Sequence, residues 1–183
     1  WKYFSTNPED AAVFNDSMSG VTAVANEEII SLYDFSGFTK LIDVGGGHGG
    51  LITSVLKKNP NLKGVLFDAP EVIEGAQTKI EAAGVADRLE TVRGNFFKAV
   101  PAGGDAYIMK WIIHDWDDQK SNTILRNIRK QIPANGRLIL IDSVVPETNE
   151  PHFSKFIDLN MLVMTGGKER TAKEFQELLA AAG

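Results

Sequence analysis

The sequence contains no cysteine among its 183 residues. A disulfide framework and a thiolate zinc site are therefore excluded, and we expect a reducing compartment, the cytoplasm. No apolar run approaches the ~20 residues that a membrane-spanning helix needs, and no basic segment followed by an apolar one opens the chain. We therefore expect a soluble protein with no membrane partner.

Basic clusters and metal-ligand spacings are also missing. The chain has 19 Lys and Arg against 24 Asp and Glu, a formal net charge of −5 at pH 7. A chain of this charge without a basic patch does not suit nucleic acid as its main partner. No set of His and carboxylate residues has the spacing of a metal site, so no metal is expected.

Short apolar runs alternate with segments of helical periodicity. Strands are expected over residues 40–44, 64–68, 89–93, 106–113 and 137–142. Helices are expected over residues 8–19, 21–34, 51–58, 70–83, 117–131, 153–163 and 171–182. This alternation predicts an α/β fold, a doubly wound parallel sheet with helices on both faces, and the length suits one such domain.

A glycine-rich stretch follows the first expected strand. Five of the six residues from Gly45 to Gly50 are glycine, and a helical pattern resumes at Leu51. Glycine allows positive φ and a close approach of the backbone to a ligand, while the free N–H groups of the next helix favour an anionic or nucleotide ligand. The stretch therefore predicts a nucleotide cradle.

The glycine spacing leaves two ligands open. Gly45, Gly47 and Gly50 fit the G-x-G-x-x-G of a dinucleotide site. Gly45, Gly47 and Gly49 equally fit a G-x-G-x-G spacing that resembles S-adenosylmethionine (SAM) methyltransferases. Asp43 favours the second interpretation, because a carboxylate there could approach the cationic methionine end of SAM.

Further candidates follow the ends of later strands, the edge at which such sheets bind ligands. Asp68 lies 23 residues after Gly45, where an acidic residue can accept both ribose hydroxyls. Its alternative role is to cap the helix that starts at Pro70. Asn95 and Phe96 suit adenine, as an amide and a stacking ring, or alternatively belong to a loop with a core phenylalanine.

The densest group of such residues is the run Met109-Lys110-Trp111-Ile112-Ile113-His114-Asp115-Trp116. It resembles the catalytic signature of the plant-type small-molecule O-methyltransferases, which include caffeic acid, isoflavone and hydroxyindole enzymes and bacterial relatives. The similarity continues through residues 43–47, 67–73 and 166–171, the last reading Gly-Gly-Lys-Glu-Arg-Thr. Four ordered motifs make this a specific match.

The resemblance implies SAM-dependent methyl transfer to a hydroxyl group with His114 as general base. An imidazole with a pKa near 6.5 can take that proton at neutral pH, and a phenol is easier to deprotonate than an alcohol. The family places acids beside the base, which correspond here to Asp142 and Glu169. Asp142 is one methylene shorter than the usual glutamate. Glu169 has an alternative role as cap of the helix near Thr171, and Asp115 is expected to start the next helix.

The same resemblance assigns binding residues. Lys110 matches a cofactor-contacting lysine, Phe96 a bulky residue against adenine, and Asn95 an aspartate that binds the adenine amino group. The residues matched to the acceptor pocket are Phe14, Met18 and Met161, whose helical spacing fits core packing equally well. The acceptor is expected to be a small aromatic or polyketide-like hydroxyl compound.

The resemblance also implies a Rossmann-like SAM-methyltransferase sheet that lacks its last strands. Residues 1–183 would form the catalytic domain, with residues 1–36 as a helical lead-in, and the N-terminal dimerisation domain of the family would be absent from this fragment. The full-length protein is then expected to be a homodimer. Two alternatives stay open at this point: an NAD-dependent oxidoreductase using the same glycine loop, and a SAM-binding relative that does not methylate.

Overall fold

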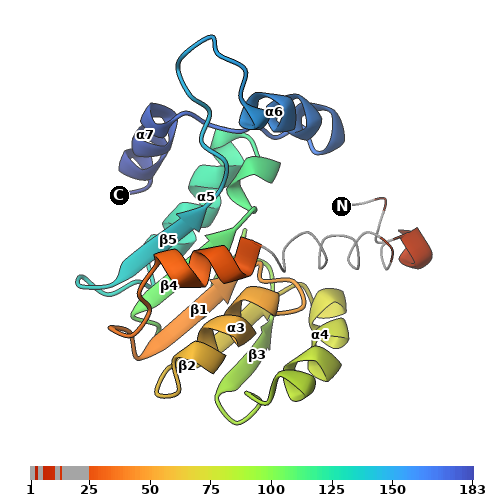
Figure 1. Cartoon of the computed structure of the whole chain (residues 1–183), viewed down its shortest axis with the longest axis vertical. Helices are drawn as coiled ribbons and strands as arrows, with labels where there is room; N and C mark the ends of the chain where they lie inside the picture. Colours follow the sequence, from red (N-terminus) through yellow and green to blue (C-terminus); the bar gives the residue numbers. More distant parts are fainter. Residues whose placement is uncertain (1–2, 4–5, 11–12, 14–24) are drawn as a thin grey trace.

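A computed structural model describes residues 3, 6–10, 13 and 25–183 (Figure 1). Its centre is a five-stranded parallel sheet in the order β3-β2-β1-β4-β5. The strands are β1 (Lys40–Val44), β2 (Lys63–Asp68), β3 (Leu89–Arg93), β4 (Ala106–Lys110) and β5 (Arg137–Ile141). Because all five run in one direction, their carboxyl ends meet at one edge of the sheet.

Helices cover both faces of the sheet, as expected for a doubly wound fold. They are α3 (Gly50–Lys58), α4 (Pro70–Ala83), α5 (Asp118–Arg129), α6 (Phe153–Met164) and α7 (Ala172–Ala182). Buried side chains of α3 and α4 pack on one face and those of α5 and α7 on the other. Figure 1 shows α6 apart from these layers, beyond the sheet. The fold class predicted from the sequence is confirmed.

Local signals set most helix ends. Pro70 opens α4 and Gly84 closes it with left-handed backbone, φ 69°. The Asp117 side chain accepts a hydrogen bond from the amide of Lys120 and so caps α5. The expectation that Asp115 starts this helix is therefore wrong.

The fourth strand is shorter than expected. It ends at Lys110, and Ile113–Asp115 form a 3-10 turn rather than strand. Trp111 has φ 56°, the left-handed region that a continuing strand cannot accommodate. His114 therefore lies on a turn four residues past the strand, held by contacts that an apolar sequence pattern does not reveal.

The N-terminal region is described only in part. Residues 8–10, 13 and 25–32 are helical. The second expected helix ends at residue 32 rather than 34, because residues 33 and 34 are described and are not helical. The other positions of the two expected helices, including Phe14 and Met18, lie outside the described residues. Of the helices in the described part of the chain, none combines the length and apolar character needed to cross a membrane.

Candidate active site

The glycine stretch forms a turn between β1 and α3. Gly45, Gly47 and Gly49 have φ of 75°, 59° and 79°, whereas Gly50 is already the first residue of α3. The left-handed positions thus follow the G-x-G-x-G spacing. The Gly47 amide donates to Asp68 Oδ2 at 2.8 Å, which ties the turn to the end of β2. Burial raises the pKa of Asp68.

Against this turn lies the buried carboxyl group of Asp43, which interacts with the charge of the half-buried Lys110. Asp43 is 1% exposed, and its Oδ2 has no hydrogen-bond partner among the described residues. Burial raises the pKa of Asp43 to about 7, although the positive charge of Lys110 acts to lower it. Burial also lowers the pKa of Lys110 to about 8. Lys110 Nζ donates to Asn26 Oδ1 at 2.7 Å. An unsatisfied carboxyl oxygen beside a glycine turn suits a ligand that brings a positive charge or a donor.

Aromatic rings line the side of the turn near β3. Phe96 and Phe97 pack with ring centroids 4.9 Å apart, and Phe97 meets Trp116 edge-on at 4.8 Å. A Cβ placed on Gly45 would lie 3.7 Å from Phe96 and 2.7 Å from Ile112. Asn95 is exposed, and its Oδ1 accepts from the amide of Phe97 at 2.8 Å. Phe96 therefore lies against the glycine turn, whereas the side-chain acceptor of Asn95 already serves its own loop.

His114 forms a short hydrogen bond across 55 residues of sequence. Its Nδ1 lies 2.8 Å from Glu169 Oε1, and the Glu169 side chain is fully buried. A carboxylate accepts this bond, so Nδ1 carries the proton and Nε2 is the atom with a free lone pair. Asp115 Oδ1 lies 3.8 Å from Nε2, beyond hydrogen-bond distance. The imidazole is thus fixed in the orientation and tautomer of a proton acceptor.

Three carboxyl groups surround this imidazole. Burial lowers the pKa of His114, but the bond to Glu169 and the neighbouring negative charges outweigh that effect, so its pKa is raised. Burial raises the pKa of Asp142 to about 7 and that of Asp115 to about 6. The cluster therefore makes the imidazole of His114 a stronger base.

The two predicted acids lie differently. Glu169 meets the histidine, and the alternative that it caps α7 is wrong, because Thr171 and Glu174 form the capping box there. Both carboxyl oxygens of Asp142 are buried and have no hydrogen-bond partner among the described residues. Asp142 thus influences His114 through charge rather than by accepting its N–H.

A model of the O-methyltransferase domain matches residues 1–183. The chain belongs to this family. The family resemblance inferred from the sequence is confirmed. This O-methyltransferase domain is 46% identical over 181 residues to phenazine O-methyltransferase PhzM of Lysobacter antibioticus, with 99% of this chain and 53% of that protein covered. It is 40% identical over 189 residues to anthranilate N-methyltransferase of Ruta graveolens, covering 100% of this chain and 50% of the relative.

A solved structure shares the fold. The O-methyltransferase NcsB1 from neocarzinostatin biosynthesis, in complex with S-adenosyl-L-homocysteine and 1,4-dihydroxy-2-naphthoic acid, matches with a TM-score of 0.92 at 32% identity. The match covers 100% of this chain and 55% of that chain. The O-methyltransferase domain described here thus spans about half the length of the relatives it matches.

Two residues of the O-methyltransferase domain near His114 received no site role from the sequence. Asp115 was expected to start a helix, yet it is buried beside the imidazole. Arg170 follows Glu169 and is fully buried. A possible signal was their position, since each directly follows a predicted catalytic residue. In the described part of the domain, no group of three or more His, Asp or Glu could hold a metal ion.

Met161, predicted to contact the acceptor, is half-buried in α6 of this O-methyltransferase domain. It lies three residues after Asp158, whose Oδ1 accepts from the Glu169 amide at 2.8 Å. Residues three apart share one face of a helix. Met161 therefore lies on the same side of α6 as Asp158, the residue that binds the Glu169 backbone.

Proposed function

We propose that this chain is the catalytic domain of a SAM-dependent O-methyltransferase that methylates a hydroxyl group of a small aromatic molecule, with His114 as general base. The observation that carries the proposal is the 2.8 Å bond between His114 and the buried Glu169, on the turn that follows β4. A buried carboxylate orients the histidine so that it can accept a proton, and it stabilises the imidazolium that results.

The residues around the glycine turn fit SAM. The orphan oxygen of Asp43 suits the cationic methionine end, and the turn at Gly45 and Gly47 allows a close approach of the backbone. Asp68, at the end of β2, would accept the ribose hydroxyls. Phe96 would pack on the adenine, and Lys110 would contact the cofactor near Asp43. Asn95 would bind the adenine edge through the second lone pair of its Oδ1, since the first accepts from the Phe97 amide.

SAM supplies an electrophilic methyl group on a sulfonium. The chain's own task is to deprotonate and orient the acceptor. Nε2 of His114 takes the proton of the acceptor hydroxyl, which leaves the oxygen free to attack. Bound SAM would supply the methyl group, its sulfur–methyl bond would break as the oxygen–methyl bond formed, and S-adenosylhomocysteine would leave. Glu169 holds the opposite nitrogen and stabilises the imidazolium, while the charges of Asp115 and Asp142 act in the same direction. The net proton leaves later to solvent.

The strength of the base limits the class of acceptor. A phenolic hydroxyl has a pKa near 10 and can be deprotonated by an imidazole, whereas an aliphatic alcohol is too weak an acid. PhzM is named for phenazine, and NcsB1 was crystallised with 1,4-dihydroxy-2-naphthoic acid; both compounds are aromatic. We therefore propose an aromatic or polyketide-like phenol, held by Met161 of α6 together with Phe14 and Met18.

A nitrogen acceptor is the second candidate, because one relative at 40% identity is named an anthranilate N-methyltransferase. A neutral aromatic amine already has its lone pair and needs no base before attack. Replacing His114 therefore separates the two candidates: the replacement abolishes methylation of a phenol but only slows methylation of an amine.

The test uses the full-length protein and SAM labelled in its methyl group. A panel of phenols and matched aromatic amines is screened for label transfer, with His114→Gln as the paired variant. We expect transfer to a phenol by the wild-type protein, loss of turnover in the variant, and equal SAM affinity in both. Preferential binding of NAD over SAM would point to the oxidoreductase alternative. SAM binding without transfer to any acceptor would point to a relative that does not methylate.

A further inference from the structure

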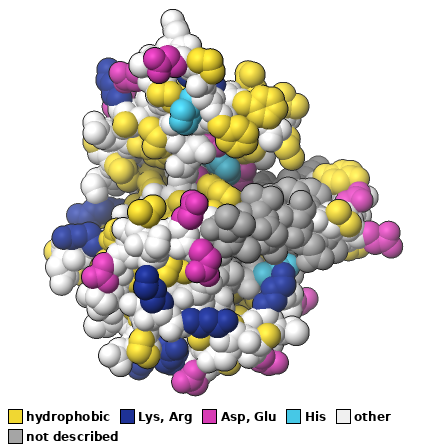
Figure 2. All heavy atoms as spheres, viewed as in Figure 1, with side chains coloured by type: hydrophobic (Ala, Val, Ile, Leu, Met, Phe, Trp, Pro, Cys, Tyr) yellow, Lys and Arg dark blue, Asp and Glu magenta, His cyan; other side chains and the backbone are white. Residues whose placement is uncertain are grey.

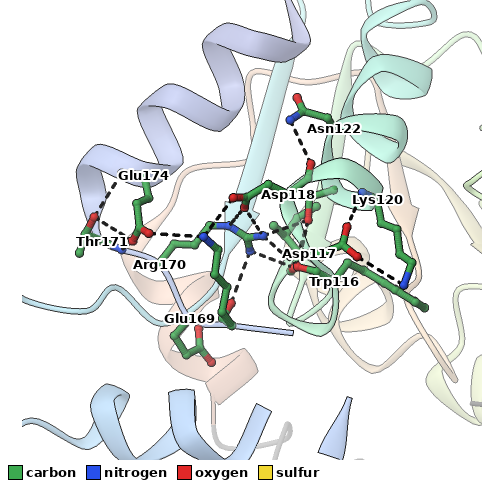
Figure 3. A network of polar contacts seen from close by, with 12 residues as sticks. Trp116, Asp117, Asp118, Lys120, Asn122, Glu169, Arg170, Thr171 and Glu174 are labelled. Carbon is green, nitrogen blue, oxygen red and sulfur yellow. Dashed lines mark hydrogen bonds and ion pairs between the residues drawn. The ribbon is translucent and has the colours of Figure 1, made fainter. Parts of the chain in front are cut away.

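Arg170 holds both ends of the turn that carries His114 (Figure 3). Its guanidinium donates from Nη1 to the carbonyl of Ile113 at 3.1 Å and from Nη2 to that of Trp116 at 2.9 Å. On its other side it binds Asp118 Oδ1 at 2.8 and 3.0 Å. The side chain is 0% exposed. A buried cation of this kind persists only where its donors are satisfied, and here two of its acceptors belong to the turn.

The backbone beside Arg170 holds the middle of the same turn. The amide of Lys168 donates to the carbonyl of His114 at 2.9 Å. Gly167 approaches so closely that a Cβ there would lie 2.0 Å from that carbonyl oxygen. The segment 167–170 therefore binds the turn before, at and after the histidine.

Glu169 lies between these two anchors and points the other way. In Figure 3 its side chain is directed away from the Arg170 guanidinium. It is this side chain that bonds to His114 Nδ1. One short segment thus fixes the turn backbone through Arg170 and Lys168, and fixes the imidazole through Glu169.

We propose that Arg170 is a positioning residue for His114, which keeps the histidine turn in register with Glu169 so that Nε2 faces the acceptor. This proposal rests on the proposed function. Arginine suits the task because its planar guanidinium carries donors on three nitrogens and can bind several fixed acceptors at once. In lysine all the donors are on one nitrogen. Without the fork, the carbonyls of residues 113 and 116 lose a buried donor and the turn is free to shift.

The charges around His114 decide which variant is informative. Asp115 faces it from its own turn, Glu169 from the segment before α7, and Asp142 from the end of β5. The charge of Arg170 also acts on Asp142, after that of His114 itself. Replacing Arg170 by a neutral residue would change both the charge and the geometry. Arg170→Lys keeps the charge and removes the fork, so it tests position alone.

The matched control is Asp118→Ala. Asp118 is 57% exposed and binds Arg170 from the solvent side, without touching the turn carbonyls through its side chain. Both variants weaken the ion pair between residues 118 and 170, but only Arg170→Lys removes the contacts to the turn. A loss of stability common to both variants therefore reports the ion pair and not positioning.

The experiment makes two kinds of measurement on the full-length protein. The first is kcat and KM for SAM, and the second is the titration of the His114 imidazole by NMR of 15N-histidine protein, assigned by its loss in His114→Gln. In Arg170→Lys we expect kcat to fall by about 100-fold, the order reported for a displacement of about 1 Å, with KM for SAM unchanged. We also expect the titration of His114 to move down toward pH 6.5, because the bond to Glu169 is weakened. Asp118→Ala should change neither.

Gly167→Ala provides a second variant should Arg170→Lys unfold, because it keeps the charge of Arg170 and should reproduce the displaced titration by pushing the turn from the other side. The proposal is overturned if Arg170→Lys folds and its His114 titration and kcat match those of Asp118→Ala. The titration of His114 can be measured without turnover, so it tests the role of Arg170 even if the wild-type protein methylates no acceptor. Such an outcome would count against the proposed function and not against the role of Arg170.

Discussion

Asp158 in α6 accepts a hydrogen bond from the backbone amide of Glu169, with 2.8 Å between Oδ1 and the nitrogen. Glu169 in turn binds His114. The helix that carries Met161 is therefore joined to the candidate base by two hydrogen bonds in series. A substitution in α6 should therefore alter the position of the His114 imidazole.

This relationship gives a first prediction. Asp158→Ala leaves the amide of the buried Glu169 without its acceptor, which costs about 1–3 kcal/mol of the free energy of unfolding. It also loosens Glu169, so we expect kcat to fall while SAM affinity is kept. Asp158→Asn keeps an acceptor oxygen and should restore most of the activity. The two variants are compared by thermal unfolding and steady-state kinetics, and equal kcat in Asp158→Ala and wild type would contradict the coupling.

The charges around His114 predict the pH dependence of the reaction. The base works only when neutral, and its pKa is raised, so kcat/KM should fall as pH is lowered through a midpoint above 6.5. Asp142→Asn removes a negative charge that favours the imidazolium. The midpoint should therefore move to lower pH in this variant. Glu90→Gln, an exposed position on β3 outside the cluster, should leave the profile in place. An upward shift in Asp142→Asn would show that the sign of this interaction is wrong.

Two adjacent glycines provide a matched pair for the histidine turn. A Cβ at Gly166 meets nothing within 4 Å, but the residue has φ 74°, so Gly166→Ala should cost about 1–2 kcal/mol through the backbone alone. A Cβ at Gly167 would overlap the His114 carbonyl oxygen. Gly167→Ala should therefore displace the turn and lose most of its activity. If both variants keep the same activity at a temperature where both are folded, the close approach is unimportant for the base.

Much of this fold could be predicted from apolar runs and breakers. β1 and β3 have the expected bounds, and α4 runs from Pro70 to the residue before Gly84 as its Pro and Gly signals require. The end of β4 could not be predicted, because Trp111-Ile112-Ile113 continues the apolar run and only the positive φ of Trp111 marks the break.

The sequence indicated several residues of the candidate site but not all of the contacts between them. Glu169 and His114 are far apart in sequence, and only the family resemblance suggested that they meet. The burial of Asp115 and Arg170 depends on how the segment 167–170 packs on the turn, a long-range contact without periodicity. Asp142 was matched by position, but whether a shorter acid reaches the imidazole is a matter of distance that no sequence motif contains.

The buried carboxyl at Asp43 predicts how SAM affinity varies with pH. Its pKa is about 7 without ligand, and a cationic methionine end needs the ionised form. SAM affinity should therefore rise with pH below 7, by up to about tenfold per pH unit, as one proton is released on binding. Methylthioadenosine keeps the adenosine but lacks the amino-acid end, so its affinity should vary little with pH. Titration calorimetry on wild type and Asp43→Asn tests this, and a SAM affinity that is flat between pH 5.5 and 7 would place the cation away from Asp43.

The outer face of α6 predicts how the 183-residue chain behaves when expressed alone. Phe153, Phe156, Leu159 and Val163, spaced three or four apart, are 62–84% exposed, and Figure 2 shows hydrophobic side chains gathered in this region. An apolar patch of this kind on a soluble domain is normally covered by another surface. We expect self-association in sizing chromatography with light scattering. Phe156→Lys should reduce it, because a charge in the patch opposes burial, whereas Gln77→Lys adds the same charge on α4 and should have no effect. A clean wild-type monomer at high concentration would show that α6 needs no partner surface.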